Sequence, residues 1–277
     1  MKMFSVSERR ACRVTGQPRS TQRYELSAID EFERRLTARL LELTRMEKYR
    51  RQGCHKIALV LKNEGWKVNR KRVHRLWKEL GLQIPPQQKK RRRGDGCSFE
   101  NACDRLKPEY PNHVWSYDFK HDVTEQGQQI KFLVVIDEFT RRCLEIRVAK
   151  SCKASDVVQT LGKLFSQHGI PTFIRSDNGP EFVAQEVAEF LRYLPVKTAF
   201  IEPGSPWQNG FCESFVGQFS NELTNGTIFG SLLEAKVLSE DYRAFYNAER
   251  LHGALDYQTP DRFYRAWSQD RIKVKVS

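Results

Sequence analysis

The sequence lacks any Cys-x-x-Cys pair, although it holds seven cysteines in 277 residues. An odd number of scattered thiols argues against a disulfide framework and against a zinc ribbon or finger. No run of about 18 apolar residues is present, so no membrane-spanning helix is expected. The first ten residues also lack the apolar segment of a secretory signal. We therefore expect reduced thiols that pack as small hydrophobic residues, in a cytoplasmic protein.

Several kinds of active site are missing as well. The sequence holds no Gly-x-Ser-x-Gly motif, no cysteine with an evident histidine partner and no glycine-rich phosphate loop. These absences argue against a covalent hydrolase and against a P-loop nucleotide-binding protein. Hydrophobic residues still make up 39% of the chain, which is enough for a packed core.

The positive charge is concentrated in one third of the chain. Residues 1–96 contain 26 Lys and Arg against 10 Asp and Glu, a net charge of +16, whereas residues 97–277 carry −3. A basic segment joined to a nearly neutral body is typical of a nucleic-acid-binding arm. A basic surface that only keeps the protein soluble remains an alternative, but it does not explain the segregation.

The basic third has helical patterns. Phe32, Leu36, Leu40 and Leu43 share one face of a helix expected over 28–48. A helix near 54–64 and a turn at Gly65 follow. Asn69 is a suitable N-cap for a last helix, which Gly81 ends.

The last helix is amphipathic and basic. Val73, Leu76, Trp77 and Leu80 form its apolar face. A turn followed by such a helix fits a helix-turn-helix recognition element, although an ordinary bundle with a basic solvated face has the same spacing. The cations on the other face are the first DNA-binding candidates: Arg70, Lys71, Arg72, Arg75 and Lys78.

A basic linker separates the two parts. Pro85 and Pro86 stop the preceding helix, and Gly94-Asp95-Gly96 is a flexible sequence. The five adjacent cations between them repel one another and are suited to follow a phosphate backbone. They are the second group of DNA-binding candidates: Lys89, Lys90, Arg91, Arg92 and Arg93.

From about residue 110 the pattern alternates between strands and helices. Such alternation predicts an α/β domain with a mixed sheet. We expect strands over 114–119, 130–137, 143–149, 172–176 and 196–201, and helices over 154–168, 181–193 and 231–247, with one more that includes Glu213.

Three carboxylates lie at positions where the neighbouring residues are apolar or predict a turn. Asp118 interrupts an apolar strand, Asp177 follows a strand directly before Asn178-Gly179, and Glu213 lies near a helix start after Asn209-Gly210. Taken singly, Asp177 is also a common turn former and Glu213 is favoured by a helix dipole. Phe211, Cys212 and Phe215 suggest a partly buried setting for Glu213.

Carboxylate-only ligation favours Mg²⁺ or Mn²⁺ over zinc. Two such ions about 4 Å apart can activate the nucleophile and stabilise the leaving group of a phosphodiester reaction. One bridging carboxylate with one more on each ion is the minimal set of ligands. Three acids are therefore enough for a two-metal site.

Asp177 and Glu213 are separated by 35 residues. This Asp–Asp–35–Glu spacing resembles that of retroviral-integrase-like transposases. The blocks Trp115–Phe119, Ile174–Phe182 and Ile201–Phe215 resemble the three motifs of bacterial insertion-sequence transposases of the second-reading-frame (OrfB) type. Two more parts of the chain are similar to that family. They are the C-terminal stretch, which consists of Tyr246-Asn247 through Leu255 and Thr259-Pro260, and the upstream block Glu64–Val73.

The resemblance implies an RNase H-like core that holds the triad Asp118, Asp177 and Glu213. It implies nicking at element ends, joining of the freed 3′-hydroxyl to target DNA, and Mg²⁺ or Mn²⁺ as cofactor. It further implies a first-frame (OrfA-type) partner, a homo-oligomer on terminal inverted repeats, and a location at the bacterial nucleoid. The expected domains are a helical DNA-binding region 1–84, a linker 85–108, a catalytic core 109–265 and a tail 266–277. Asn178, Gly179, Asn209 and Gly210 are expected to shape the loops beside the acids.

Some positions depart from the family pattern. Ser220 stands where the family usually has Lys or Arg, Val216 where it commonly has Asn, and Leu251 where it commonly has Pro. These departures leave open a catalytically impaired or domesticated DNA-binding relative. An RNase H-type nuclease is a third hypothesis, although the basic arm disfavours it. Arg250 and His252 are candidates for phosphate contact or for a plain surface role, and Trp115 and Trp207 are expected to pack.

Overall fold

The computed structural model describes residues 6–23, 31–83, 106–176, 185–200 and 209–276. The chain divides into two compact units, Met1–Met46 and Glu47–Ser277. Each unit is described by itself. Within the described residues, no helix is both long enough and apolar enough to cross a membrane.

The first unit is helical. It contains α1 (Glu8–Thr15), α2 (Arg19–Gln22) and α3 (Glu31–Arg45). The Ser7 side chain caps α1 by accepting a hydrogen bond from the backbone N–H of Arg10, and Gly16 ends the helix with φ of 67°. On α3 the predicted leucines at positions 36, 40 and 43 are all fully buried.

The second unit begins with the predicted pair of helices, α4 (Cys54–Asn63) and α5 (Arg70–Glu79). Between them Gly65 has φ of 91°, a conformation that glycine adopts without steric cost. Asn69 is the N-cap of α5, because its Oδ1 accepts from the backbone N–H of Lys71 at 3.0 Å. Val73, Leu76 and Trp77 are buried, as the apolar face of this helix predicted.

A mixed five-stranded sheet follows, as the sequence predicted. Its order is β3-β2-β1-β4-β5. β2 pairs antiparallel with β1 and with β3, whereas β4 pairs parallel with β1 and with β5. The strands have these bounds: β1 Val114–Val123, β2 Gln129–Asp137, β3 Cys143–Ala149, β4 Phe173–Ser176 and β5 Lys197–Phe200.

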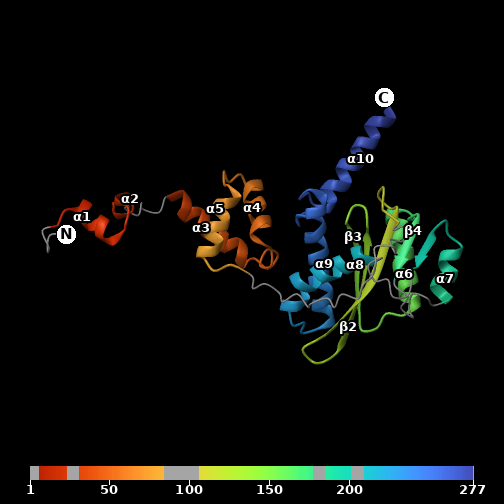
Figure 1. Cartoon of the computed structure of the whole chain (residues 1–277). Helices are drawn as coiled ribbons and strands as arrows, with labels where there is room; N and C mark the ends of the chain where they lie inside the picture. The colour runs from red at the N-terminus through yellow and green to blue at the C-terminus, as the bar shows by residue number, and fades with distance from the viewer. Residues whose placement is uncertain (1–5, 24–30, 84–105, 177–184, 201–208, 277) are drawn as a thin grey trace, which may run out of the picture. The chain divides into compact units, whose positions relative to one another are not determined.

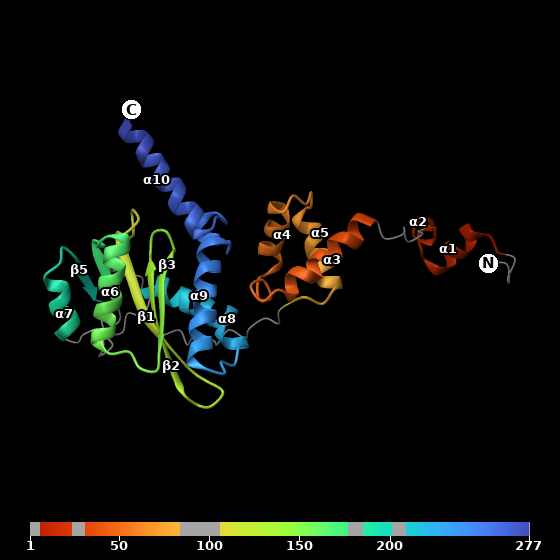
Figure 2. The ribbon, with the colours of Figure 1, turned by 180° about the vertical axis from the view of Figure 1, so that it is seen from behind.

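Helices cover both faces of this sheet, and α6 and α9 lie on opposite sides of it (Figures 1 and 2). On one face α6 (Ala154–His168) and α7 (Gln185–Arg192) pack against Trp115, Tyr117 and Ile174. On the other face α8 (Gly210–Glu222) and α9 (Leu232–Ala248) pack against the even-numbered residues of β2, from Ile130 to Ile136. This two-sided layering is that of the expected α/β core.

The last helix is α10 (Pro260–Val276). A short 3₁₀ turn, η3 (Thr224–Gly226), lies between α8 and α9, and another, η4 (Gly253–Leu255), lies between α9 and α10. The sequence patterns did not predict α10. It contacts the turn after β2, where Phe139 lies 5.5 Å from Phe263 and 6.0 Å from Trp267 between ring centroids. The same turn is fixed by Asp137, whose buried carboxylate accepts from the backbone N–H groups of Asn112, Phe139 and Thr140.

Candidate active site

Asp118 lies in the middle of β1, opposite Val134 of β2. Side chains alternate along a strand, and Trp115 and Tyr117 face the α6 side of the sheet. Asp118 therefore faces the other side, where α8 and α9 pack. The carboxylate is half-buried, and its Oδ1 accepts from the backbone N–H of Phe119 at 2.7 Å. β1 thus presents an acid toward α8.

Glu213 lies in the first turn of α8, as predicted. Cys212, Phe215 and Phe219 anchor this helix on the sheet, because all three are at most 2% exposed. Glu213 itself is exposed, so the expectation of a partly buried setting was wrong for the carboxylate. Its neighbours are the buried residues, because adjacent positions on a helix point in different directions.

The Cys212 thiol is buried between α8 and the sheet. Burial raises the pKa of this thiol well above its usual value, and the negative charges of Asp118, Glu138 and Glu213 raise it further. α8 packs against β1 and β2, so the helix that bears Glu213 lies on the face of the sheet that bears Asp118. The raised pKa keeps the Cys212 thiol in its neutral form at neutral pH.

Asp177 lies outside the described residues, as do Asn178 and Gly179. Ser176, the residue before it, is buried and ends β4, the strand next to β1. In the parallel pairing of these strands, Ser116 lies opposite Arg175. The described structure thus brings two of the three predicted acids toward one place and ends β4 beside them.

A buried ion pair was missed by the sequence patterns. Arg175 Nη1, on β4, donates to both carboxylate oxygens of Glu138 at 3.1 Å. The side chain of Arg175 is 5% exposed and that of Glu138 is 0% exposed. Arg175 Nη2 also donates to the carbonyl of Leu106 at 3.0 Å. The only sequence signal was a charged residue inside an apolar strand, two positions before Asp177. The pair fixes the end of β4 to the end of β2.

Of the four predicted loop-shaping residues, two are described. Asn209 is 3% exposed, and its Oδ1 has no hydrogen-bond partner among the described residues. Gly210 is the first residue of α8. Both precede Glu213 by less than one and a half helical turns.

The basic candidates of α5 lie opposite its buried face. Arg70, Lys71, Arg75 and Lys78 are exposed, whereas Arg72 is partly buried. Arg75 forms an i,i+4 ion pair with Glu79 at 3.6 Å. The linker candidates Lys89, Lys90, Arg91, Arg92 and Arg93 lie outside the described residues.

Arg250 is part of the core and is not a surface residue. It is 5% exposed, and its Nε and Nη2 each donate to the Glu222 carboxylate at 2.7 Å. His252 is partly buried, and burial lowers its pKa to about 4, with the charges of Arg250 and Arg141 adding to this effect. Trp115 is fully buried and packs as expected, while Trp207 lies outside the described residues.

Two of the three departures from the family pattern, Val216 and Ser220, lie on α8, whereas Leu251 follows α9 and is buried. Ser220 is seven residues after Glu213, about two helical turns away on the same side of the helix. Its hydroxyl donates to the carbonyl of Val216 at 2.7 Å, and both residues are partly buried. Neither side chain supplies a cation beside Glu213.

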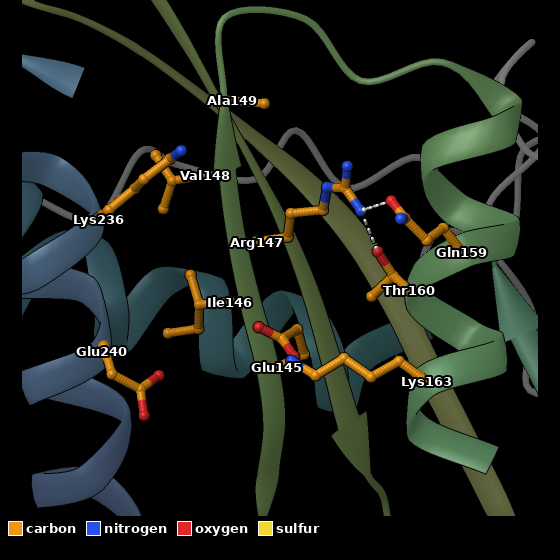
Figure 3. Close-up of a pocket in the computed structure, with 10 residues that line it drawn as sticks. All are labelled: Glu145, Ile146, Arg147, Val148, Ala149, Gln159, Thr160, Lys163, Lys236 and Glu240. Carbon is orange, nitrogen blue, oxygen red and sulfur yellow. Dashed lines mark hydrogen bonds and ion pairs between the residues drawn. The ribbon is translucent and has the colours of Figure 1, made fainter. Parts of the chain in front are cut away.

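A hollow of about 660 Å³ lies at the β3 edge, between α6 and α9 (Figure 3). Arg147 extends across it and donates to Gln159 and Thr160 of α6, while Lys236 and Glu240 of α9 line the opposite side. β3 is separated from β1 by β2, and neither Asp118 nor Glu213 lines this hollow.

Among the residues that the structure describes, no three Asp, Glu, His or Cys side chains gather as metal ligands. Asp177 is not among those residues. The donor set at the site still fits a hard divalent cation: Asp118 and Glu213 offer carboxylate oxygens, and the nearby thiol remains protonated.

Comparison with known proteins gives concordant matches. Residues 108–206 and 194–260 each match an integrase core domain, and residues 31–91 match an HTH-like domain. The catalytic core domain of HTLV-2 integrase in complex with magnesium aligns with a TM-score of 0.44 and 21% identity, over 57% of this chain and 99% of that one.

Two curated bacterial relatives cover most of the chain. An uncharacterized 31.7 kDa protein of insertion element IS407 from Burkholderia multivorans is 35% identical, over 94% of this chain and 91% of its own length. The transposase for insertion sequence element IS904 from Lactococcus lactis is 27% identical, over 84% and 95%. With its helix-turn-helix region and mixed-sheet core, the chain belongs to the family of bacterial insertion-sequence transposases with an integrase core domain.

Proposed function

We propose that the protein nicks the ends of a mobile DNA element and joins the freed 3′-hydroxyl to target DNA by a divalent-metal-dependent transesterification. The observation that carries this proposal is that α8, which bears Glu213, packs against the face of the sheet on which β1 presents Asp118. Family membership supplies the class of reaction, a polynucleotidyl transfer.

Asp177 completes the proposed site. Along β4, Ile174 faces the α6 side, so Arg175 faces the α8 side. Position 177 is two residues after Arg175 and directly follows the last residue of β4. Side chains two residues apart on a strand point to the same face. A strand that continued for one more residue would direct its carboxylate toward the same side as Asp118. This step is part of the proposal.

Asp118, Asp177 and Glu213 would hold Mg²⁺ or Mn²⁺, and three acids are enough ligands for two such ions. When bound, two such ions supply charge stabilisation for the attacking and leaving oxygens of an in-line displacement. The protein's own part is to fix the carboxylates on rigid elements. β1 is central in the sheet and α8 is anchored by three buried side chains, so both acids are held by the core rather than by a loop.

The exposed cations of α5 are proposed to contact DNA phosphates and bases, and those of 89–93 to follow the backbone. The domain limits 1–84, 85–108, 109–265 and 266–277 are retained as a proposal. An OrfA-type partner, a homo-oligomer on the terminal repeats and a place in the bacterial nucleoid belong to the same proposal.

The test is joining of a labelled element-end oligonucleotide to plasmid DNA in Mg²⁺, with the first-frame protein added. Asp118→Asn is expected to abolish joining and to keep the fold. Asp122→Asn is a matched control, because it removes an acid from the same face of the same strand and is expected to remain active. Equal activity of the wild type and Asp118→Asn would refute the proposal.

Ser220 favours a second candidate, a DNA-binding relative with impaired catalysis, because no cation stands at that position. Titration calorimetry with Mn²⁺ separates the two. Heat of binding that disappears in Asp177→Asn supports the catalytic function, whereas DNA binding without any Mn²⁺ signal supports the second candidate. Comparing cleavage of an RNA–DNA hybrid with that of an element-end duplex tests the RNase H-type alternative.

A further inference from the structure

A second hollow lies along α8 itself, next to the candidate site. It measures about 310 Å³, within the range of roughly 300–1,000 Å³ that small-molecule sites occupy. Phe211, Ser214 and Gln218 of α8 form one side of it, and Tyr246 of α9 and His252 form another. Arg141, from the turn between β2 and β3, closes a third side. Nothing in the proposed chemistry uses this hollow.

Its walls are flat and aromatic. The Arg141 guanidinium carbon lies 3.8 Å from the centroid of the Phe211 ring. The rings of Tyr246 and His252 meet edge to face, at 6.2 Å and 80°. Aromatic rings and guanidinium planes are the surfaces on which unstacked nucleobases stack in nucleic-acid-binding proteins.

Polar atoms in the same hollow lack partners. His252 Nδ1 and Gln218 Oε1 are buried and have no hydrogen-bond partner among the described residues. Gln218 Nε2 donates to the Ser214 hydroxyl at 3.3 Å, which turns the amide oxygen away from that partner. The lowered pKa keeps the imidazole of His252 neutral at neutral pH, so that one ring nitrogen donates and the other accepts. A ligand with both donors and acceptors on a planar edge would satisfy these groups.

The position of the hollow limits what reaches it. Ser214 follows Glu213 directly, and Phe211 precedes it by two residues, so all three lie within one helical turn of about 5.4 Å. A DNA strand whose phosphodiester lies at Glu213 therefore has its neighbouring nucleotides at the mouth of the hollow. Arg141 has a backbone φ of 61°, a strained conformation for a residue with a side chain, which is common at functional positions.

We infer that this hollow receives one unstacked nucleobase of the DNA strand that lies at Glu213. The inference rests on the proposed function, because that function places DNA at this carboxylate. The base packs against the stacked pair of Phe211 and Arg141, and its hydrogen-bonding edge meets Gln218 and His252. Extrusion of a base from the helix opens the strand beside the phosphodiester that reacts.

The test uses the full-length protein and a DNA duplex with a single-stranded overhang. A single 5-iodouracil is placed at successive positions of the overhang, and the complex is irradiated. The crosslinked peptide is then identified by mass spectrometry. Because 5-iodouracil reacts with aromatic side chains in contact with it, we expect one position to crosslink to Phe211.

A variant that fills the hollow from an exposed position tests the inference without disturbing the core. Ala254 lines the hollow and is exposed, so Ala254→Trp closes the hollow from its rim. It is expected to remove the crosslink and to weaken binding of the same duplex several-fold. Leu233→Trp is the matched control: it adds the same side chain at a position that is 70% exposed and outside the hollow, and it should bind like the wild type.

An abasic nucleotide at the crosslinking position tests whether the base itself is bound. It should lower affinity several-fold in the wild type and not in Ala254→Trp. Full wild-type affinity for the abasic probe overturns the inference, since the hollow then contacts only the backbone. Crosslinks confined to residues 31–91, with normal metal-dependent joining, also overturn it and leave the proposed function intact. A crosslink at Phe211 without any joining upholds base binding and refutes the proposed function.

Discussion

The side-chain amide of Asn247 on α9 bonds both backbone groups of Cys143, the first residue of β3. Its Oδ1 accepts from the Cys143 N–H and its Nδ2 donates to the Cys143 carbonyl, each at 2.8 Å. β3 is an edge strand of the described sheet, so no further strand pairs with its outer side. One amide on a helix thus satisfies a backbone that the sheet leaves unpaired.

Asn247→Ala is therefore expected to be strongly destabilising. It leaves a buried N–H and a buried carbonyl without partners, at a cost of about 2–4 kcal/mol in the free energy of unfolding. Urea unfolding followed by circular dichroism measures the loss. Asn225→Ala, at an exposed position, is the control and should change stability by less than about 0.5 kcal/mol. Similar midpoints for the two variants would contradict the role assigned to Asn247.

The buried pair of Arg250 and Glu222 gives a second prediction. Glu222 also accepts from the Tyr242 hydroxyl at 3.1 Å, and its side chain is only 11% exposed. Arg250→Met leaves the Glu222 carboxylate buried without its positively charged partner. A loss of about 3–5 kcal/mol in the free energy of unfolding is therefore expected. Replacing both residues, as Arg250→Met with Glu222→Leu, should recover part of that loss because no buried charge remains.

The control for this pair is a surface pair on α9. Arg243 donates to Glu240, whose side chain is 56% exposed. Arg243→Met should cost no more than about 1 kcal/mol, because solvent screens an exposed ion pair. If Arg250→Met unfolds at the same urea concentration as Arg243→Met, the buried pair has no special structural role.

Local patterns predicted the elements that are defined by their own sequences. β3 and α6 have the predicted bounds, because apolar alternation in one and a 3.6-residue period in the other mark both ends. The helix over 260–276 was not predicted, because its packing depends on Phe139, more than 120 positions earlier. Tertiary contact of this kind leaves no signal within a short window.

The candidate site shows the same division. Spacing and strand context predicted Asp118 and Glu213, which lie on β1 and on α8, two elements that pack against each other. The ion pair of Arg175 and Glu138 joins two strands across 37 residues, so only the folded sheet shows it. The exposure of Glu213 was also hidden, because its apolar neighbours in sequence lie on a different side of α8.

His252 predicts a pH dependence of stability. Its pKa is lowered from 6.5 to about 4 in the folded protein, mainly by burial. Arg250, Arg141 and Lys56 lower it further, whereas Glu222 raises it. Between these two values the unfolded chain binds the proton and the folded chain does not. Stability is therefore complete above about pH 6.5 and falls as the pH decreases toward 4.

A single proton changes the free energy of unfolding by at most about 1.4 kcal/mol per pH unit. Solvent around the partly exposed imidazole ring reduces this slope. His252→Gln removes this contribution. The difference in free energy of unfolding between wild type and variant should change with pH between 6.5 and 4, in the direction that favours the variant at low pH. Urea unfolding at half-unit intervals measures it. Parallel profiles for the two proteins would show that the imidazole is not desolvated.

Ser220→Lys tests whether α8 lacks a cation beside the candidate site. Position 220 shares a side of the helix with Glu213, and the serine hydroxyl is held by the carbonyl of Val216 rather than by a distant partner. A lysine here loses only that local bond and extends its ammonium toward solvent. It is expected to strengthen binding of an element-end duplex and to steepen the slope of log K against log salt by about 0.9, the value for one added phosphate contact.

Asn221→Lys is the matched control, since it adds the same charge one residue along the helix at an exposed position. A contact that depends on the side of α8 should appear for position 220 and be weaker for position 221, because adjacent residues point about 100° apart on a helix. Fluorescence anisotropy over a series of salt concentrations measures both slopes. Equal gains from the two lysines would mean that added charge alone attracts DNA, and that the surface beside Glu213 has no defined place for the strand.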